Sequence, residues 1–268
     1  MTITAMRTRP LASPTTSLRL GIDVGGTAIK YGVVDTADGT VLGPVRQVPT
    51  PQPATPVAVA DALSDVVAQV LLERPELDPA DSGLPVGVAF PSVIRNGVAL
   101  SAANISADWM GLDVNAFLSD RLGCPVRVSN DADAAGLAEA AHGAGHGTGG
   151  VIMVLTLGTG IGSALVADGK LVPNFELGHL ELGGTKAERK ASAVARERDG
   201  LDWAAYAERL QEYLAHVEFL FSPDLMILGG GISVRHGEFL PHLSLRTPVV
   251  PALLANTAGV VGAALTVS

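Results

Sequence analysis

Two short glycine turns, each following an apolar run, are the parts of this sequence best suited to binding phosphate. The first is DVGGT at residues 23–27, and the second is LGTG at residues 157–160. A turn without side chains lets backbone N–H groups approach an anion closely, and a threonine adds a hydroxyl donor. Neither is a Walker A loop, because no Gly-Lys-Ser/Thr follows. A third glycine run, at residues 229–231, favours phosphate binding over plain hairpin turns.

Asp23 stands directly before the first turn, where bound phosphate would repel its carboxylate. A Mg²⁺ ion between them removes that repulsion, because hard cations prefer oxygen ligands. Mg²⁺ keeps several waters, so Asp23 can act through one of them. The alternative is an aspartate that accepts hydrogen bonds from the turn amides.

The stretch SNDADAAG places Asn130 and Asp131 where a strand ends and a helix begins. Asp131 there is either a helix N-cap or the base that accepts a proton from an attacking hydroxyl. A helix N-terminus favours the ionised carboxylate, so we expect a ready acceptor that is a weak base and acts mainly through its position. Such a base suits phosphoryl transfer, which needs little help with bond making.

The stretch NFELGHLEL holds Glu176 and His179, three residues apart and therefore on one side of a helical turn. They could bind a metal, but the sequence offers no evident third ligand. They could equally bind the hydroxyls of a sugar, one accepting and one donating a hydrogen bond. A plain surface turn is the third alternative.

Strand-like and helix-like segments alternate along the chain, which predicts an α/β fold. Residues 22–42 resemble residues 155–172, because each segment has a strand, a glycine turn, a second strand, an Asp-Gly turn and a third strand. We predict two equivalent sheets, each presenting its glycine turn to one cleft; the alternative is a chance similarity of hairpins. Helical spacing predicts the helices at 57–72, 132–143, 203–221 and 256–265.

The composition limits the classes of partner. The chain has 268 residues, a net charge of −9 and one cysteine, Cys124. The acidic balance predicts no nucleic-acid or membrane partner. One cysteine cannot form an internal disulfide or a thiolate zinc site, which favours a cytoplasmic location. Residues 1–17 lack the apolar core of a signal peptide and are expected to form a flexible tail.

Five motifs occur in the order found in one enzyme family: GIDVGGTAIKYGVVD, NDADAAG, LTLGTGIGSAL, ELGH and LGGGIS. With them, the chain resembles the ROK sugar kinases of the actin-like ATPase superfamily. TPQPATP, RTPVVPA and NTAGVVGAA are similar to segments of polyphosphate-dependent glucokinases. The similarity covers about residues 18–266 and is greatest to the polyphosphate/ATP glucomannokinases.

The resemblance implies a ribonuclease H-like fold with two lobes around a central cleft. The small lobe would be 18–131 with the C-terminal helix 253–268, and the large lobe 132–252. The implied reaction moves a phosphoryl group from inorganic polyphosphate or ATP to the 6-hydroxyl of glucose, and also of mannose. Asp131 would be the base and Asp23 the Mg²⁺ ligand.

The resemblance also assigns binding residues. The sugar would contact Asn104, Asn130, Asp131, Glu176, His179 and Glu188. The phosphates would contact Gly25, Gly26, Thr27, Lys30, Gly158, Thr159 and Gly160, with adenosine near Gly229, Gly230 and Gly231.

One departure from the family concerns zinc. Many ROK proteins carry a Cys-x-Cys-Gly-x-x-Gly-Cys motif after the Gly-His pair, and here GHLELGGTKAERKAS has no cysteine. We therefore expect no zinc, and a zinc role for His179 is in doubt. ROK repressors carry a DNA-binding domain before the first glycine turn, for which 17 residues are too few.

Two rival functions stay open, an ATP-only ROK sugar kinase and a non-catalytic sugar-sensing regulator. The sequence also leaves open glucose against mannose, and monomer against homodimer. Polyphosphate poses a further question in a chain of charge −9, because a long polyanion needs a local basic track. The candidates for such a track are Lys30, Arg46, Lys170, Lys186, Arg189 and Lys190.

Overall fold

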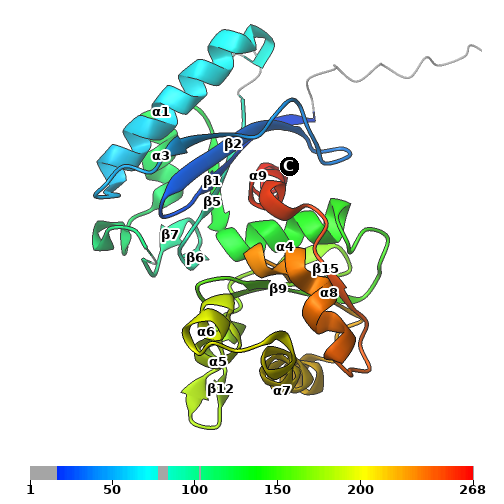
Figure 1. Ribbon diagram of the computed structural model, residues 1–268. Coiled ribbons are helices and arrows are strands. Elements are labelled where there is room, and N and C mark those ends of the chain that lie inside the picture. Colours follow the sequence, from blue (N-terminus) through cyan, green and yellow to red (C-terminus); the bar gives the residue numbers. More distant parts are fainter. Residues whose placement is uncertain (1–16, 78–83, 103, 268) are drawn as a thin grey trace, which may run out of the picture.

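The computed structural model describes residues 17–77, 84–102 and 104–267. Figure 1 shows two sheets with helices α4 and α9 between them, helices α1 and α3 outside the first sheet, and α5–α7 beyond the second. The predicted tail at residues 1–17 lies outside the described residues, apart from Ser17. No helix in the described ranges is both long and apolar enough to cross a membrane.

The first sheet has the strand order β3-β2-β1-β5-β8, with β4 beside β2. Strand β1 runs antiparallel to β2 and parallel to β5, which is in turn parallel to β8. Val, Ile and Leu fill the buried strands, as expected where both faces are covered. The strands are β1 (Leu18–Val24), β2 (Ala28–Asp35), β3 (Thr40–Val41), β4 (Arg46–Pro49), β5 (Val86–Phe90) and β8 (Val126–Asn130).

The second sheet repeats the first. Its order is β11-β10-β9-β14-β15, with β9 antiparallel to β10 and parallel to β14. The strands are β9 (Val151–Leu157), β10 (Ile161–Ala167), β11 (Lys170–Val172), β14 (Leu225–Gly229) and β15 (Val249–Pro251). This correspondence confirms the prediction of two equivalent sheets and excludes a chance similarity between hairpins.

The four predicted helices are also present. Helix α1 buries Val59, Leu63, Val66, Val67 and Val70 on one face, as their spacing predicts. Helices of the described residues are α1 (Pro56–Glu73), α3 (Val114–Leu122), α4 (Asp131–His142), α5 (Glu188–Ala191), α6 (Ala193–Arg198), α7 (Trp203–Phe221), α8 (His236–Phe239) and α9 (Ala258–Leu265). The described residues also form four short strands, which are β6 (Ile94–Arg95), β7 (Val98–Ala99), β12 (Glu181–Leu182) and β13 (Thr185–Lys186). They contain six 3₁₀ turns, which are η1 (Pro75–Leu77), η2 (Ala107–Trp109), η3 (Leu177–His179), η4 (Gly231–Arg235), η5 (Leu240–His242) and η6 (Ala255–Thr257).

Helix α9 is packed backbone to backbone against its neighbours. A Cβ added at Gly262 would overlap the carbonyl oxygen of Ala134 in α4, and one at Gly87 in β5 would overlap that of Ala263. The C-terminal helix therefore lies inside the molecule, between the first sheet and α4. The boundaries of the two lobes stay a prediction.

The buried carboxylate of Glu139 in α4 fixes the segment that leads into α9. It accepts hydrogen bonds from the backbone N–H groups of Leu253 at 3.1 Å and Leu254 at 2.7 Å, and from that of Ala144 at 2.9 Å. With 1% of its surface exposed, Glu139 depends on these three donors in place of water.

Candidate active site

The first glycine turn connects β1 to β2, and its carbonyl groups are held from one side. Thr50 Oγ1 donates a hydrogen bond to the Gly25 carbonyl at 2.6 Å, and Gln52 Nε2 donates to that of Gly26 at 3.0 Å. In a trans peptide the next residue's N–H points opposite to the carbonyl. The N–H groups of Gly26 and Thr27 therefore point away from residues 50–52, and neither has an acceptor among the described residues.

Thr50 gives a direct test of this support. It is 4% exposed, so Thr50→Val removes the hydroxyl with little change of shape and leaves the Gly25 carbonyl without its donor. If the turn binds the donor phosphates, as the resemblance to sugar kinases implies, the KM for the phosphoryl donor should rise about tenfold, for a loss of roughly 1–2 kcal/mol, with sugar affinity unchanged. The control is Thr266→Val, which removes a similar bond, to the Ala263 carbonyl at 2.7 Å, beyond the end of α9. Equal donor KM values in the two variants would contradict the role of Thr50.

The second turn connects β9 to β10 in the same way. The Val194 N–H donates to the Gly158 carbonyl at 3.2 Å, which turns the N–H of Thr159 away from α6. The GGG run lies behind this turn, because a Cβ at Gly230 would overlap the backbone of Leu157. The structure thus brings two of the three glycine runs together, and each of the two glycine turns between strands presents backbone N–H groups.

Asn130, and not Asp131, caps helix α4. Its Oδ1 accepts the N–H groups of Ala132 at 2.9 Å and Asp133 at 3.1 Å, and its Nδ2 donates to the Ser92 carbonyl at 3.1 Å. The second N–H of the Asn130 side chain has no acceptor among the described residues. The N-cap alternative for Asp131 is excluded, and its carboxylate accepts only the Ala132 N–H, at 2.8 Å, among the described residues.

The expectation that Asp131 is a weak base was wrong. Its carboxylate reaches solvent but has protein on most sides, and poor hydration raises its pKa to about 6. The negative charges of Asp23 and Glu176 add to this rise, while the hydrogen bond from Ala132 opposes it. Desolvation and like charges outweigh the helix N-terminus here.

Asp133, two residues on, ties this helix to a neighbouring loop. It is 1% exposed, and its Oδ2 accepts the Asn174 N–H at 2.8 Å. The Asn174 side chain in turn pairs with the backbone of Ile94, accepting at 3.0 Å and donating at 2.8 Å. This chain of bonds connects the segment after β11 to the segment after β5. Burial raises the pKa of Asp133 to about 6 as well.

The predicted sugar residues fall near these turns. His179 Nε2 lies 3.6 Å from Glu188 Oε1, and the other Glu188 oxygen would be 2.6 Å from a Cβ at Gly160. Asn104 backs the first turn, with its Cβ 3.0 Å from where a Gly26 Cβ would stand. Glu176 is exposed and close enough to Asp131 to raise its pKa. No group of three or more His, Cys, Asp or Glu side chains suited to a metal occurs in the described residues.

Asp23 lies near the end of β1, directly opposite Lys30 on the neighbouring strand β2. Burial raises the pKa of its carboxyl, and the nearby Lys30 ammonium opposes that rise. Asp23 and Asp131 are thus two poorly hydrated carboxylates that disfavour each other's ionised form. A hard cation such as Mg²⁺ fits beside Asp23, because it would offset the charge of that poorly hydrated carboxylate.

Sequence reasoning did not identify Thr50, Gln52, Asp133 or Asn174. The first two lie in TPQPATP, whose only signal in the sequence is its similarity to segments of polyphosphate-dependent glucokinases. Asn174 stands two residues before Glu176, and its left-handed backbone, with φ of 65°, gave no signal in the sequence.

Comparison with known proteins identifies the family. Residues 19–193 match the model of the ROK family. This chain belongs to the ROK family. A polyphosphate glucokinase of Mycobacterium tuberculosis H37Rv is 43% identical over 267 residues, covering 99% of this chain and 97% of that protein.

Two solved structures extend the comparison. The inorganic polyphosphate/ATP-glucomannokinase of Arthrobacter sp. strain KM is 60% identical, with a TM-score of 0.85 over 94% of this chain and 98% of that one. A ROK family glucokinase from Streptomyces griseus, in complex with glucose and AMPPNP, is 27% identical, with a TM-score of 0.74 over 93% and 99% of the two chains. The repeated sheets of this ROK protein are therefore the actin-like ATPase fold of sugar kinases, which confirms the predicted family and fold class.

Proposed function

We propose that this ROK protein is a kinase that transfers a phosphoryl group from inorganic polyphosphate or ATP to the 6-hydroxyl of glucose. Mannose is a second acceptor. The observation that carries the proposal is the pair of equivalent glycine turns together with Asp131, a carboxylate whose pKa is raised by its burial and by the nearby charges of Asp23 and Glu176. The polyphosphate glucokinase and the glucomannokinase named above, similar over nearly the whole chain, support polyphosphate as donor.

Each side chain takes a role that its position supports. Asp131 accepts the proton of the 6-hydroxyl, and a pKa of about 6 makes it a stronger base than an ordinary aspartate. His179, Glu188, Glu176, Asn130 and Asn104 hold the sugar hydroxyls. The N–H groups of the two turns bind the donor phosphates and stabilise charge on the group in transfer.

Asp23 would hold Mg²⁺, directly or through water. The ion would supply positive charge beside the donor phosphates, which Lys30 supplements. The adenosine of ATP lies near residues 229–231, behind the second turn. Gly230 takes a φ of 84° there, a left-handed conformation suited to glycine.

The raised pKa of Asp131 predicts how activity depends on pH. The base must be ionised, so kcat/KM for glucose should fall about tenfold per pH unit below about pH 6. Because the pKa of Asp131 is higher in the folded state than its ordinary value of 3.8, protonation of this group favours the folded state. Its contribution to the free energy of unfolding should therefore increase, not decrease, as the pH falls through about 6. Circular dichroism should therefore show intact structure at pH 5. A Glu176→Gln variant removes one negative neighbour of Asp131 and should lower the pKa of that carboxyl. The pH at which kcat/KM falls to half its maximum should then be lower than in the wild type. An unchanged pH of half-maximal kcat/KM would contradict the assignment of Asp131 as the base.

One experiment separates a kinase from a sugar-sensing regulator. Glucose is titrated into the purified protein by calorimetry, and hexose 6-phosphate is then assayed with ATP, on glucose and on mannose, with and without Mg²⁺. We expect binding of glucose and Mg²⁺-dependent turnover on both sugars. Glucose binding without any turnover would indicate the regulator, and turnover on glucose alone would remove mannose.

A further inference from the structure

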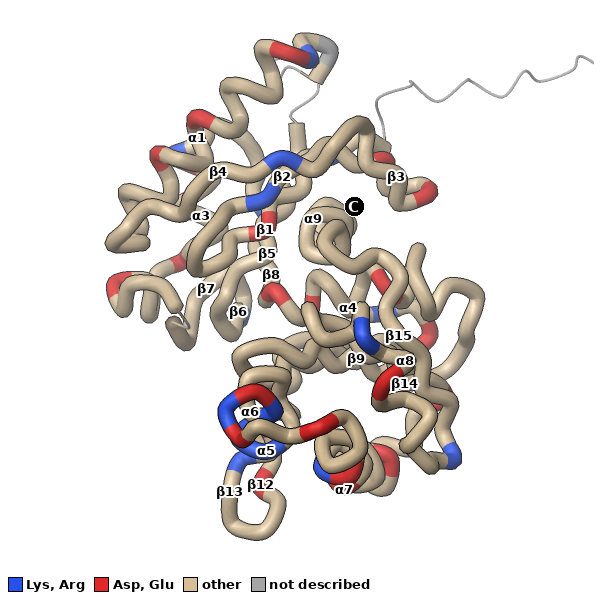
Figure 2. Tube along the Cα trace, in the orientation of Figure 1, with Lys and Arg blue, Asp and Glu red and all other residues tan. Residues whose placement is uncertain are grey.

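A basic segment stands out in this acidic chain. Residues 186–196 carry four cations and one carboxylate, a net charge of +3, whereas the whole chain has −9. Figure 2 shows Lys and Arg gathered on β13, α5 and α6, with acidic residues among them on α6. The cations are Lys186, Arg189, Lys190 and Arg196, called here the basic segment.

The basic segment begins beside the second phosphate turn. Glu188, at the start of α5, lies against Gly160, and Val194 in α6 is hydrogen-bonded to Gly158. The hydroxyl of Tyr206 in α7 donates a hydrogen bond to the Ala191 carbonyl at 2.9 Å, which fixes the connection between α5 and α6 to helix α7. The cations of α5 and α6 therefore flank a connection that is fixed next to the second glycine turn.

Three of the four charges of the basic segment, those of Lys186, Arg189 and Lys190, are available to a ligand. Lys186 and Arg189 are exposed, and within the described residues neither they nor Lys190 form an ion pair. The one carboxylate, Glu188, is directed at His179. Arg196 is half-buried and stacks on the ring of Trp203, 3.6 Å from its centroid, so this cation–π contact already engages its charge.

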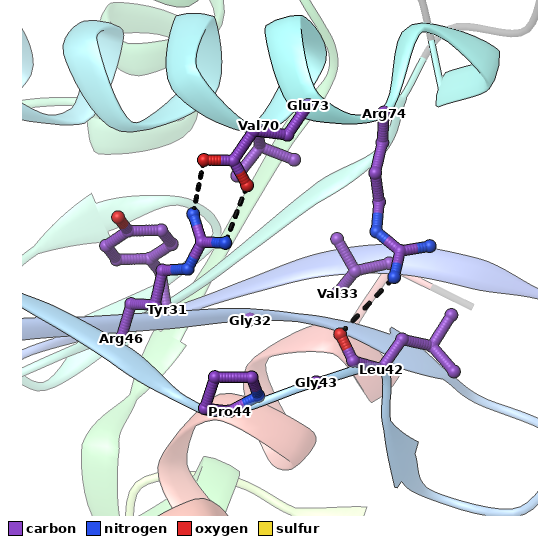
Figure 3. Close-up of a pocket in the computed structure, with 10 residues that line it drawn as sticks. All are labelled: Tyr31, Gly32, Val33, Leu42, Gly43, Pro44, Arg46, Val70, Glu73 and Arg74. Atoms are coloured by element: carbon purple, nitrogen blue, oxygen red, sulfur yellow. Dashed lines mark hydrogen bonds and ion pairs between the residues drawn. The ribbon is translucent and has the colours of Figure 1, made fainter.

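Two other candidates for a basic track are placed elsewhere. Arg46 forms a two-bonded ion pair with Glu73, at 2.6 and 2.7 Å, and lines a cavity of about 360 Å³ beside α1 that contains no residue of either glycine turn (Figure 3). Gly160 precedes β10, and Lys170 lies beside the other end of that strand, opposite Ala167. Because β10 has seven residues, Lys170 is about 20 Å from Gly160. Lys30 lies at the first turn, beside Asp23.

We propose that the basic segment is the binding track for the polyphosphate chain beyond the phosphates held at the two turns. The proposal rests on the proposed function, which supplies polyphosphate as a donor. A linear polyanion with many phosphates can contact more than one of the segment's cations, and these attractions add along its length. The triphosphate of ATP ends in a nucleoside, so it has no further phosphates to place on β13, α5 and α6.

The test compares donors in a variant carrying Arg189→Gln and Lys190→Gln, with kcat/KM measured for long-chain polyphosphate, tripolyphosphate and ATP. Removing one exposed ionic contact costs roughly threefold, so losing two contacts should lower the long-chain polyphosphate to ATP ratio about tenfold. The preference for long-chain polyphosphate over tripolyphosphate should shrink in parallel. The matched control is Lys170→Gln, which removes an exposed cation at the far end of β10 and should leave the ratio unchanged.

Salt gives a second readout. In the wild type, added KCl should weaken the use of long-chain polyphosphate more than that of ATP, and the difference should be smaller in the double variant. An unchanged donor ratio, or equal losses with ATP and polyphosphate, would overturn the track. A wild type that uses ATP alone would instead show that polyphosphate is not a donor, which refutes the proposed donor and the track together. A single Lys186→Gln variant gives the same comparison if the double variant unfolds at a lower temperature.

Discussion

Asp131→Asn is expected to lower kcat by roughly 10²- to 10⁴-fold, the usual contribution of a general base. The amide keeps the shape of the side chain and the oxygen that accepts the Ala132 N–H, but it cannot take a proton from the 6-hydroxyl. Glucose affinity should therefore change by only a few-fold. Stopped assays of glucose 6-phosphate give kcat, and calorimetry gives the affinity.

The matched control for this change is Asp65→Asn, on the exposed face of α1. It makes the same chemical replacement far from the turns in the sequence and should leave kcat unaltered. If Asp131→Asn kept near-normal turnover, the assignment of the base would be wrong. If Asp131→Asn instead abolished glucose binding, the loss of turnover would come from lost sugar binding. Asp131 would then be assigned as a sugar ligand and not as the base.

Gly262→Ala is expected to have the largest effect on stability, a loss of about 3 kcal/mol. The new methyl group would overlap the carbonyl oxygen of Ala134, a backbone atom of α4 that cannot rotate away. The helices must then separate, and the contacts of α9 with β1 and β5 weaken with them. Chemical denaturation monitored by circular dichroism measures this loss.

Gly237→Ala provides the control for this prediction. Gly237 lies in α8, and a Cβ there would meet nothing within 4 Å. Because alanine favours helix over glycine, this variant should be equal to the wild type or up to about 1 kcal/mol more stable. A Gly262→Ala protein as stable as Gly237→Ala would show that α9 and α4 are not in close contact.

The repeated sheets were predictable because the signals for them are local. In each repeat, apolar runs indicate the strands, glycines indicate the first turn and Asp-Gly indicates the second. All of these signals lie in the segment itself and do not depend on distant residues. The face of α1 was predictable for the same reason, since Val59, Leu63 and Val66 recur with helical spacing. The position of α9 was not, because small residues favour any close contact, and only the fold shows which one forms.

The candidate site was predictable in its residue types and less so in its electrostatics. The helix N-terminus at Asp131 is visible in the sequence, but the crowding that raises its pKa comes from segments far apart along the chain. The bonds from Thr50 to Gly25 and from Asn174 to Ile94 join residues 25 and 80 positions apart. Such supporting contacts depend on the assembled sheets, so no periodicity or motif indicates them.

The measurement that tests the central claim most directly follows phosphorus from polyphosphate to glucose by ³¹P NMR. Purified protein is mixed with glucose, Mg²⁺ and long-chain polyphosphate, with no nucleotide present. We predict that the resonance of glucose 6-phosphate grows as internal phosphates of the chain are consumed, at a rate that Asp131→Asn reduces by orders of magnitude. No glucose 6-phosphate from polyphosphate, under conditions where ATP supports its formation, would contradict the account.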